Sequence, residues 1–246
     1  MREYRRFIPV LAAVAALNVQ AARDCYVVRR SGQKVRGEAL AAESDGTLQL
    51  KLGSSGPVQT FKPGTYLYGY IPKPKAVSDL ERAFEGGSYD DVVKYAPAIF
   101  EKYKYLGWGD HVSYMEGMVY IDRKNYTQAQ QAFERGSRFQ AGHGEELVKG
   151  MVLALLGQKK IDEVQPMLER MMKAPDADAA AFAFNARGRI LVQQGRKKEA
   201  VLEFLKALLL FRPGTAERER EDARKQVVAL LEELKDPRWK EFEKLE

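Results

Sequence analysis

The sequence predicts an α+β chain that is mainly α, in which a small N-terminal β-barrel precedes an α-solenoid of about five helical hairpins. Two observations lead to this fold class. Between Cys25 and Ile71 apolar and polar residues alternate with a period of two, which is typical of strands. Beyond Ala76 small and aromatic residues recur at a nearly constant interval, and such an interval indicates stacked helical hairpins.

Residues 1–21 predict a secretory signal peptide. Three arginines among the first six residues precede an apolar run from Phe7 to Leu17, and small residues surround a cleavage position after Ala21. The run is much shorter than the roughly 20 residues that a helix needs to cross a bilayer. We therefore expect export, and a soluble or peripheral mature protein without a spanning helix. An uncleaved N-terminal anchor is the alternative.

Charge and cysteine content favour the periplasm or another part of a bacterial cell envelope. The formal net charge is +6, but residues 76–246 carry 28 basic and 29 acidic side chains, so the basic surplus lies in the first 75 residues. Because an exported protein meets little nucleic acid, that surplus favours anionic glycan, phospholipid headgroups or an acidic protein as partner. Cys25 is the only cysteine, so the chain has no internal disulfide, as is ordinary for large helical periplasmic proteins.

Residues 22–75 are expected to form the small β-barrel. Alternation and turn-forming residues predict five strands, at 25–30, 34–42, 47–52, 58–62 and 66–71. A closed barrel is the most economical arrangement of so many short strands, because an open sheet would leave unpaired edges. With a glycine early in the second strand and an aspartate-glycine turn before the third, the layout resembles the small Sm-like and Src-homology (SH3-like) barrels.

Tyrosines at alternate positions of the last strand are expected on one face of the barrel, where aromatic rings beside cations can hold a sugar or peptide. The candidate glycan and anion surface consists of Lys34, Lys51, Lys62, Tyr66, Tyr68 and Tyr70. The alternative is that the tyrosines only pack against the helices that follow.

The predicted solenoid occupies residues 76–246. Four residues take corresponding positions in successive second helices, at intervals of 37, 35 and 36 residues: Val92, Ala129, Val164 and Ala200. In the first helices, Gly117, Gly150 and Gly188 are expected to recur where the two helices of a hairpin approach closely.

Two units resemble the tetratricopeptide repeat (TPR). One supplies Gly117, Tyr120, Tyr126, Ala129, Phe133 and Gly136, and the last full unit supplies Gly188, Gly195, Ala200, Phe204, Ala207 and Pro213. The family's pattern places small residues where helices touch and a large aromatic residue between neighbouring hairpins. The resemblance therefore implies a TPR-like solenoid whose concave wall is built from the first helices.

Other units depart from the pattern. The unit at 144–174 is expected to carry two extra residues at its turn, because Gly157 and Val164 do not fit the usual spacing together. Pro97 falls inside the second helix of the first unit. The polar helix expected at 215–234, with a short helix after Pro237, suits a water-facing cap at the end of a solenoid.

The sequence lacks the residue sets of the common enzyme classes. It contains no GxSxG, HExxH, Walker or dinucleotide-binding motif, and His111 and His143 are its only histidines. We expect no catalytic residue, no metal site and no cofactor.

The TPR resemblance implies a peptide-binding groove. Carried over residue by residue, its wall consists of His111, Tyr114, Met118, Leu147, Met151, Phe182, Asn185, Arg189 and Gln193. Asn185 and Arg189, one helical turn apart, are candidates to hold a peptide backbone or a carboxylate, and the alternative is that they only solvate that face.

The function expected from these features is a non-enzymatic adaptor or scaffold of the bacterial cell envelope that binds another protein or peptide segment in the concave groove. The alternative is a module that binds cell-wall glycan or anionic lipid through the basic barrel and its tyrosines. No nucleic-acid partner is expected. The sequence determines neither the partner's identity nor the oligomeric state.

Overall fold

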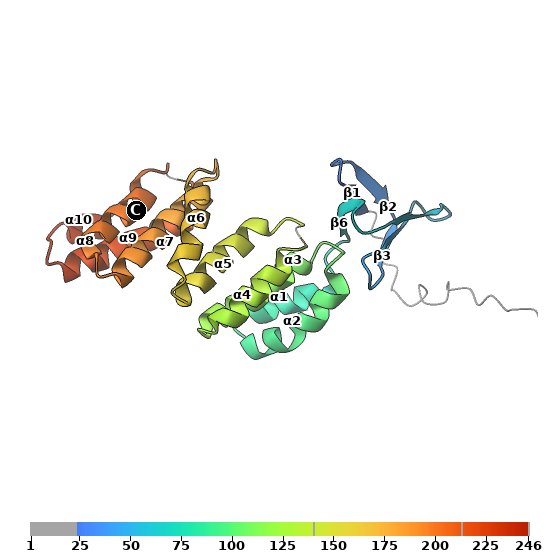
Figure 1. Cartoon of the computed structure of the whole chain (residues 1–246), viewed down its shortest axis with the longest axis horizontal. Helices are drawn as coiled ribbons and strands as arrows, with labels where there is room; N and C mark the ends of the chain where they lie inside the picture. The colour runs from blue at the N-terminus through green and yellow to red at the C-terminus, as the bar shows by residue number, and fades with distance from the viewer. Residues whose placement is uncertain (1–23, 140, 213, 246) are drawn as a thin grey trace, which may run out of the picture. The chain divides into compact units, whose positions relative to one another are not determined.

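A computed structural model of the chain describes residues 24–139, 141–212 and 214–245, which divide into two compact units after Pro72 (Figure 1). The predicted signal peptide at 1–21 and the repeat-closing Pro213 lie outside the described residues.

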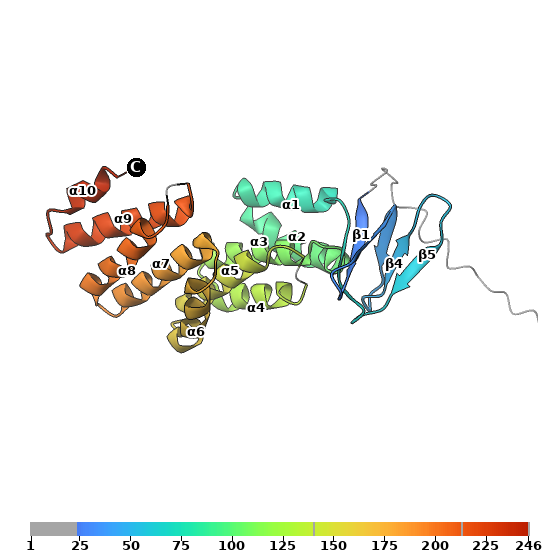
Figure 2. The same cartoon turned by 90° about the horizontal axis from the view of Figure 1, so that it is seen from above.

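The N-terminal unit contains two three-stranded antiparallel sheets. The strands are β1 (Cys25–Arg29), β2 (Lys34–Gly37), β3 (Ala39–Ala42), β4 (Leu48–Lys51), β5 (Val58–Phe61) and β6 (Tyr66–Tyr70). One sheet has the order β2-β1-β6 and the other β3-β4-β5 (Figure 2 shows strands of both). Val27, Leu48 and Leu50 are fully buried, which confirms that the alternating apolar residues form the core of this unit.

The prediction of a single strand at 34–42 was wrong, because two strands, β2 and β3, occupy this segment. The unit therefore has six strands among the described residues rather than the five predicted. A Cβ atom at Gly37 would lie 2.5 Å from the carbonyl oxygen of Lys51, so the backbones approach closely here. The N–H of Glu38 donates to that same oxygen at 2.8 Å. The chain thus leaves the first sheet at Gly37 and enters the second at Ala39, and the described strands pair as two separate ladders.

The C-terminal unit consists of five successive helical hairpins, as predicted (Figures 1 and 2). The helix pairs are α1 (Lys75–Glu85) and α2 (Tyr89–Tyr103), α3 (Gly109–Asp122) and α4 (Tyr126–Gly136), α5 (Gly144–Gly157) and α6 (Ile161–Met172), α7 (Ala177–Gln193) and α8 (Lys197–Leu209), and α9 (Glu217–Glu233) and α10 (Trp239–Glu243). Helix α2 continues through Pro97, and the last hairpin ends in a short helix.

The corresponding small residues of the second helices lie in the core. Val92, Ala129, Val164 and Ala200 are all fully buried, which confirms the alignment that defined the repeat. Each second helix also packs on the first helix of the following hairpin, so the core continues from one hairpin to the next.

The ring of Phe133 in α4 lies between two glycines. A Cβ atom at Gly117 in α3 or at Gly150 in α5 would come within 2.4 Å of this ring. Gly150 therefore does not occupy the position expected for it, because it faces the aromatic residue of the preceding hairpin rather than of its own. Gly188 does face its own hairpin, since a Cβ atom there would lie 2.7 Å from the ring of Phe204.

All five hairpins turn in the same way. The turn residues with left-handed backbone are Gly87, Lys124, Lys159, Gly195 and Lys235, with φ between 57° and 75°. In each turn the residue after the left-handed one donates its N–H to a first-helix carbonyl five positions earlier, as from Asn125 to Tyr120 at 2.8 Å and from Lys160 to Leu155 at 2.9 Å. The pattern is a Schellman motif, which satisfies the last carbonyl groups of a helix.

The expected insertion at the turn of the third hairpin was wrong. Three residues separate α5 from α6, as they separate α3 from α4 and α7 from α8. The left-handed residue of this turn is Lys159 rather than Gly157. Gly157 is small for another reason, because a Cβ atom there would lie 2.3 Å from the ring of Tyr126.

We predict that Lys159→Gly stabilises the protein by about 0.5–1 kcal/mol, because a left-handed conformation costs an L-residue about 1–2 kcal/mol that glycine avoids. The matched change Gly195→Ala should destabilise it by about 1 kcal/mol for the same reason. Urea unfolding of both variants measures the two effects, and changes of the same sign would refute the common turn geometry.

Candidate functional site

A pocket lies where the first helices of four successive hairpins meet. Its volume is about 270 Å³, and it is lined by Tyr114, Met118, Glu146, Lys149, Gly150, Leu153, Asp178, Phe182, Arg218 and Glu219. These residues come from α3, α5, α7 and α9. We call this set the inner pocket.

Three residues of the predicted groove line the inner pocket, namely Tyr114, Met118 and Phe182. Tyr114 and Met118 are one helical turn apart on α3, and both are partly buried. Phe182 on α7 is largely buried. The first helices of this part of the solenoid therefore present aromatic and apolar side chains to one concavity.

The sequence misplaced the pocket residues of α5 by two positions. Leu147 and Met151, which were expected in the groove, belong to the hydrophobic core, with Leu147 buried and Met151 packed beside it. The pocket instead receives Glu146, Lys149 and Leu153. This error follows from the misread turn, because counting back from Lys159 rather than from Gly157 shifts the α5 register by two residues. The equal length of the three turns was the signal that could have placed the α5 residues correctly.

Asn185 and Arg189 connect two helices of the solenoid. Asn185 is fully buried, and its Nδ2 atom donates to the backbone oxygen of Glu219 at 2.8 Å and to Glu219 Oε2 at 3.0 Å. Arg189 forms an ion pair with Asp222 at 2.5 Å. Both side chains thus hold α7 against α9, and Gln193 lies exposed at the end of α7. None of the three lines the inner pocket.

His111 takes part in a cluster of ionisable groups nearer the start of the solenoid. Its Nε2 atom lies 2.6 Å from Glu81 Oε1, and Lys73 donates to the same carboxylate at 2.8 Å. The centroids of the His111 and His143 imidazole rings are 4.4 Å apart. Asp110 is fully buried and accepts the backbone N–H groups of Ala141 and His143 at 2.8 and 3.0 Å.

The two histidines of this cluster have opposite pKa shifts. Burial, together with the nearby charge of His143, lowers the pKa of His111 against the opposing effect of Glu81. The interaction with Asp110, whose Oδ1 atom lies 3.5 Å from Nδ1, raises the pKa of His143. Burial disfavours the ionised form of Asp110, but the bonds from His143 and Ala141 outweigh it and lower the pKa of this carboxyl.

The N-terminal unit brings only part of the predicted glycan and anion surface together. Tyr26, which was not among the predicted residues of this surface, stacks on Tyr70 with ring centroids 4.8 Å apart, and Tyr68 contacts the Tyr26 ring edge-on. Lys34 Nζ lies 4.8 Å above the ring of Tyr26. These residues belong to one sheet, β2-β1-β6.

The remaining members of that predicted surface lie elsewhere in the unit. Lys51 is exposed at the end of β4 in the other sheet, and Lys62 is exposed immediately after β5. Tyr66 is buried, and its hydroxyl donates to the carbonyl oxygen of Gly46. The expected single face for all three tyrosines was wrong, because a register shift between Val28 and Arg29 separates the pairing of Tyr66 from that of Tyr68.

Residues 24–245, apart from 140 and 213, contain neither a cluster of metal ligands nor a membrane-spanning helix. Within them, no three side chains of the His, Cys, Asp and Glu types are arranged to hold a metal ion. No helix in the same described part combines the length and the apolar character needed to cross a membrane.

Comparison with known proteins supports the repeat assignment. The sequence model of the tetratricopeptide repeat family matches residues 183–212, the segment that contains most of α7 and all of α8. The hairpin formed by α7 and α8 is therefore similar to a tetratricopeptide repeat. The helical hairpins before and after it share its turn geometry.

Two solved structures are similar to parts of this chain. The structure titled "MamA AMB-1 P212121" is 16% identical in sequence with a TM-score of 0.44, over 70% of this chain and 90% of that one. The other, titled "Crystal structure of YrrB: a TPR protein with an unusual peptide-binding site", is 20% identical with a TM-score of 0.37, over 67% of this chain and 74% of that one. Comparison with curated protein sequences gives no match.

We predict that stability passes through a maximum near pH 6.5, the ordinary pKa of histidine, as far as these histidines determine it. Stabilisation from the raised pKa of His143 is complete below that value and is lost as the pH rises through the folded-state pKa. Stabilisation from the lowered pKa of His111 is complete above it and is lost as the pH falls.

Urea unfolding between about pH 5.5 and pH 8.5 tests this prediction. His143→Gln should flatten the decline on the alkaline side, and His111→Gln should reduce the decline on the acid side. Parallel pH profiles for the two variants would contradict the assigned shifts.

Proposed function

We propose that the C-terminal unit is a non-enzymatic scaffold that binds a segment of another protein in the inner pocket. The observation that carries this proposal is the composition of the pocket. Met118, Leu153 and Phe182 give it apolar surface from three different helices. Charged side chains of both signs accompany them, which is the usual combination of apolar anchor site and polar rim in a protein interface.

The charged side chains suit a peptide that carries both an apolar anchor and polar flanks. Lys149 lies 6.0 Å from the centre of the Phe182 ring, so a cation borders the apolar surface directly. Glu146 and Asp178 contribute negative charge from the starts of α5 and α7, and Arg218 contributes positive charge from α9. An extended segment could therefore find partners for its backbone and side chains of either sign.

We further propose that the protein acts in a bacterial cell envelope. This part of the proposal rests on the features of residues 1–21, the single cysteine and the basic N-terminal segment. The role that fits is an adaptor that holds another envelope protein in place rather than one that transforms a substrate.

Site-specific photocrosslinking in intact cells of the source organism tests the scaffold function. We predict that a photoreactive amino acid at Leu153 links the chain to one dominant protein, whereas the same amino acid at Glu169, exposed on the second helix α6, does not. Lys149→Glu should reduce the Leu153 adduct at least about tenfold, because reversing a rim charge repels the ligand that the original charge attracted. Equal adducts at Leu153 and Glu169 would refute binding in the inner pocket.

A second candidate function is favoured by the aromatic stack of the N-terminal unit. The rings of Tyr26, Tyr68 and Tyr70 lie together beside Lys34, an arrangement that can hold a sugar ring or an anionic headgroup. In this alternative the N-terminal unit binds cell-wall glycan or anionic lipid.

We predict that Tyr26→Ala abolishes such binding and that raising the salt concentration weakens it steeply, because exposed charges are screened. Sedimentation with purified cell-wall fragments, and separately with vesicles containing anionic lipid, measures the effect. Thr60→Ala, an exposed change on β5 in the other sheet, is the matched control. Binding that survives Tyr26→Ala would exclude this second function.

A further inference from the structure

Helix α8 is apolar on two faces. Its inner face, formed by Val201, Phe204, Ala207 and Leu208, lies in the core. Its outer face carries Leu202 and Leu209, each 59% exposed, with Leu210 immediately after the helix at 64%. A helix on the surface of a folded unit normally turns polar residues to water, so this outer row needs a covering partner. We call Leu202, Leu205 and Leu209 the α8 ridge.

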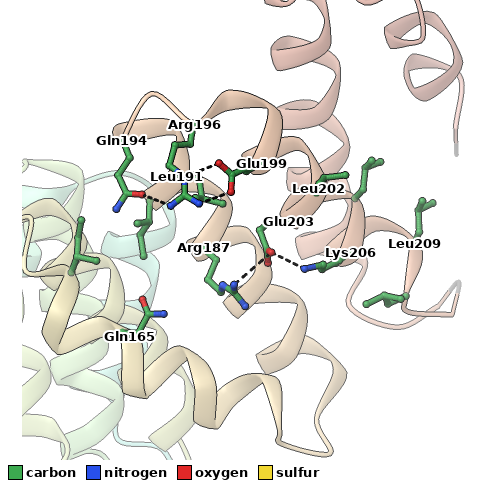
Figure 3. A pocket seen from close by; sticks show the side chains of 14 residues that line it. Gln165, Arg187, Leu191, Gln194, Arg196, Glu199, Leu202, Glu203, Lys206 and Leu209 are labelled. Atoms are coloured by element: carbon green, nitrogen blue, oxygen red, sulfur yellow. Dashed lines mark hydrogen bonds and ion pairs between the residues drawn. The ribbon is translucent and has the colours of Figure 1, made fainter.

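A hollow lies directly beside the α8 ridge (Figure 3). It has a volume of about 580 Å³ and is bounded by residues of α6, α7 and α8. Ile161, Ile190 and Leu191 contribute apolar surface from the far side, and the ridge itself forms the near side. We call this hollow the outer groove, and it shares no lining residue with the inner pocket.

All five charged side chains that line the outer groove form ion pairs within the chain, in which three cations share two carboxylates. Arg196 pairs with Glu199. Glu203, which is largely buried, lies between Arg187 at 3.6 Å and Lys206 at 2.7 Å, as the dashed lines of Figure 3 indicate. The groove therefore offers a partner mainly apolar contact, and no unpaired charge on its wall selects an acidic or a basic ligand.

We infer that the occupant is a second copy of this chain, with the α8 ridge of each copy lying in the outer groove of the other. The ridge forms one wall of the groove, and half of the fourteen residues that line the groove are apolar. A two-fold axis brings each onto its counterpart, so one rotation covers both exposed rows at once. Because charges of both signs line this face and each has an ion-pair partner within the chain, two identical faces repel each other less than two surfaces of one sign would.

A different protein as occupant would cover the groove but would have to supply a ridge of its own and a separate hollow for the α8 ridge. The second copy supplies both. This distinction makes the inference testable through the oligomeric state of the pure protein.

Sedimentation equilibrium of the purified chain over about 1–200 μM tests the proposal. We expect a monomer–dimer equilibrium in which the double variant Leu202→Glu with Leu209→Glu weakens self-association at least about 100-fold. The matched control is Tyr95→Glu, since Tyr95 is an exposed apolar residue on another helix of the same unit, and it should leave the dimer unchanged.

Thermal unfolding followed by circular dichroism checks that the double variant is folded, as expected for side chains that are more than half exposed. A wild-type chain that is monomeric throughout the concentration range would overturn the inference. A dimer that persists in the folded double variant would overturn it as well, because its interface would then lie elsewhere.

Discussion

The packing of Phe133 between Gly117 and Gly150 is the contact on which the arrangement of the solenoid depends. One ring contacts the first helix of its own hairpin and the first helix of the next, and it leaves no room for a Cβ atom on either. Each glycine inside a helix costs about 1 kcal/mol relative to alanine. Removing a buried phenylalanine side chain costs about 3–5 kcal/mol, so the packing outweighs the two glycines and fixes how far apart the helices lie.

That spacing, together with a constant turn, determines which residues reach the inner pocket. Because the turns at Lys124, Lys159 and Gly195 are alike, equivalent positions of successive first helices point in the same direction. Tyr114 and Met118 on α3 therefore meet Lys149 and Leu153 on α5. The apolar and charged groups of the pocket come from several hairpins, so its shape depends on stacking rather than on any single hairpin.

The sequence predicted the hairpins well because small residues at helix contacts leave a periodic pattern, as at Val92, Ala129, Val164 and Ala200. It failed at the third turn because Lys159 adopts a backbone conformation for which glycine is the usual signal. That one failure displaced the predicted α5 groove residues from Glu146, Lys149 and Leu153 to Leu147 and Met151. The roles of Asn185 and Tyr66 were beyond prediction, since they depend on contacts with residues 34 and 20 positions away. The break at Gly37 likewise reflects a close approach to β4.

A double-mutant cycle tests whether position 150 must be glycine to accommodate the Phe133 ring. The free energy of unfolding is measured in urea for Gly150→Ala, Phe133→Leu and the double variant. We expect Gly150→Ala to reduce the free energy of unfolding by about 1–3 kcal/mol in the wild-type chain, because the added methyl group overlaps the ring. With Leu at position 133 the same change should cost less than about 0.5 kcal/mol or stabilise the helix. An equal loss of unfolding free energy with Phe133 and with Leu at this position would contradict this expectation, because the effect of Gly150→Ala would then be independent of the aromatic ring.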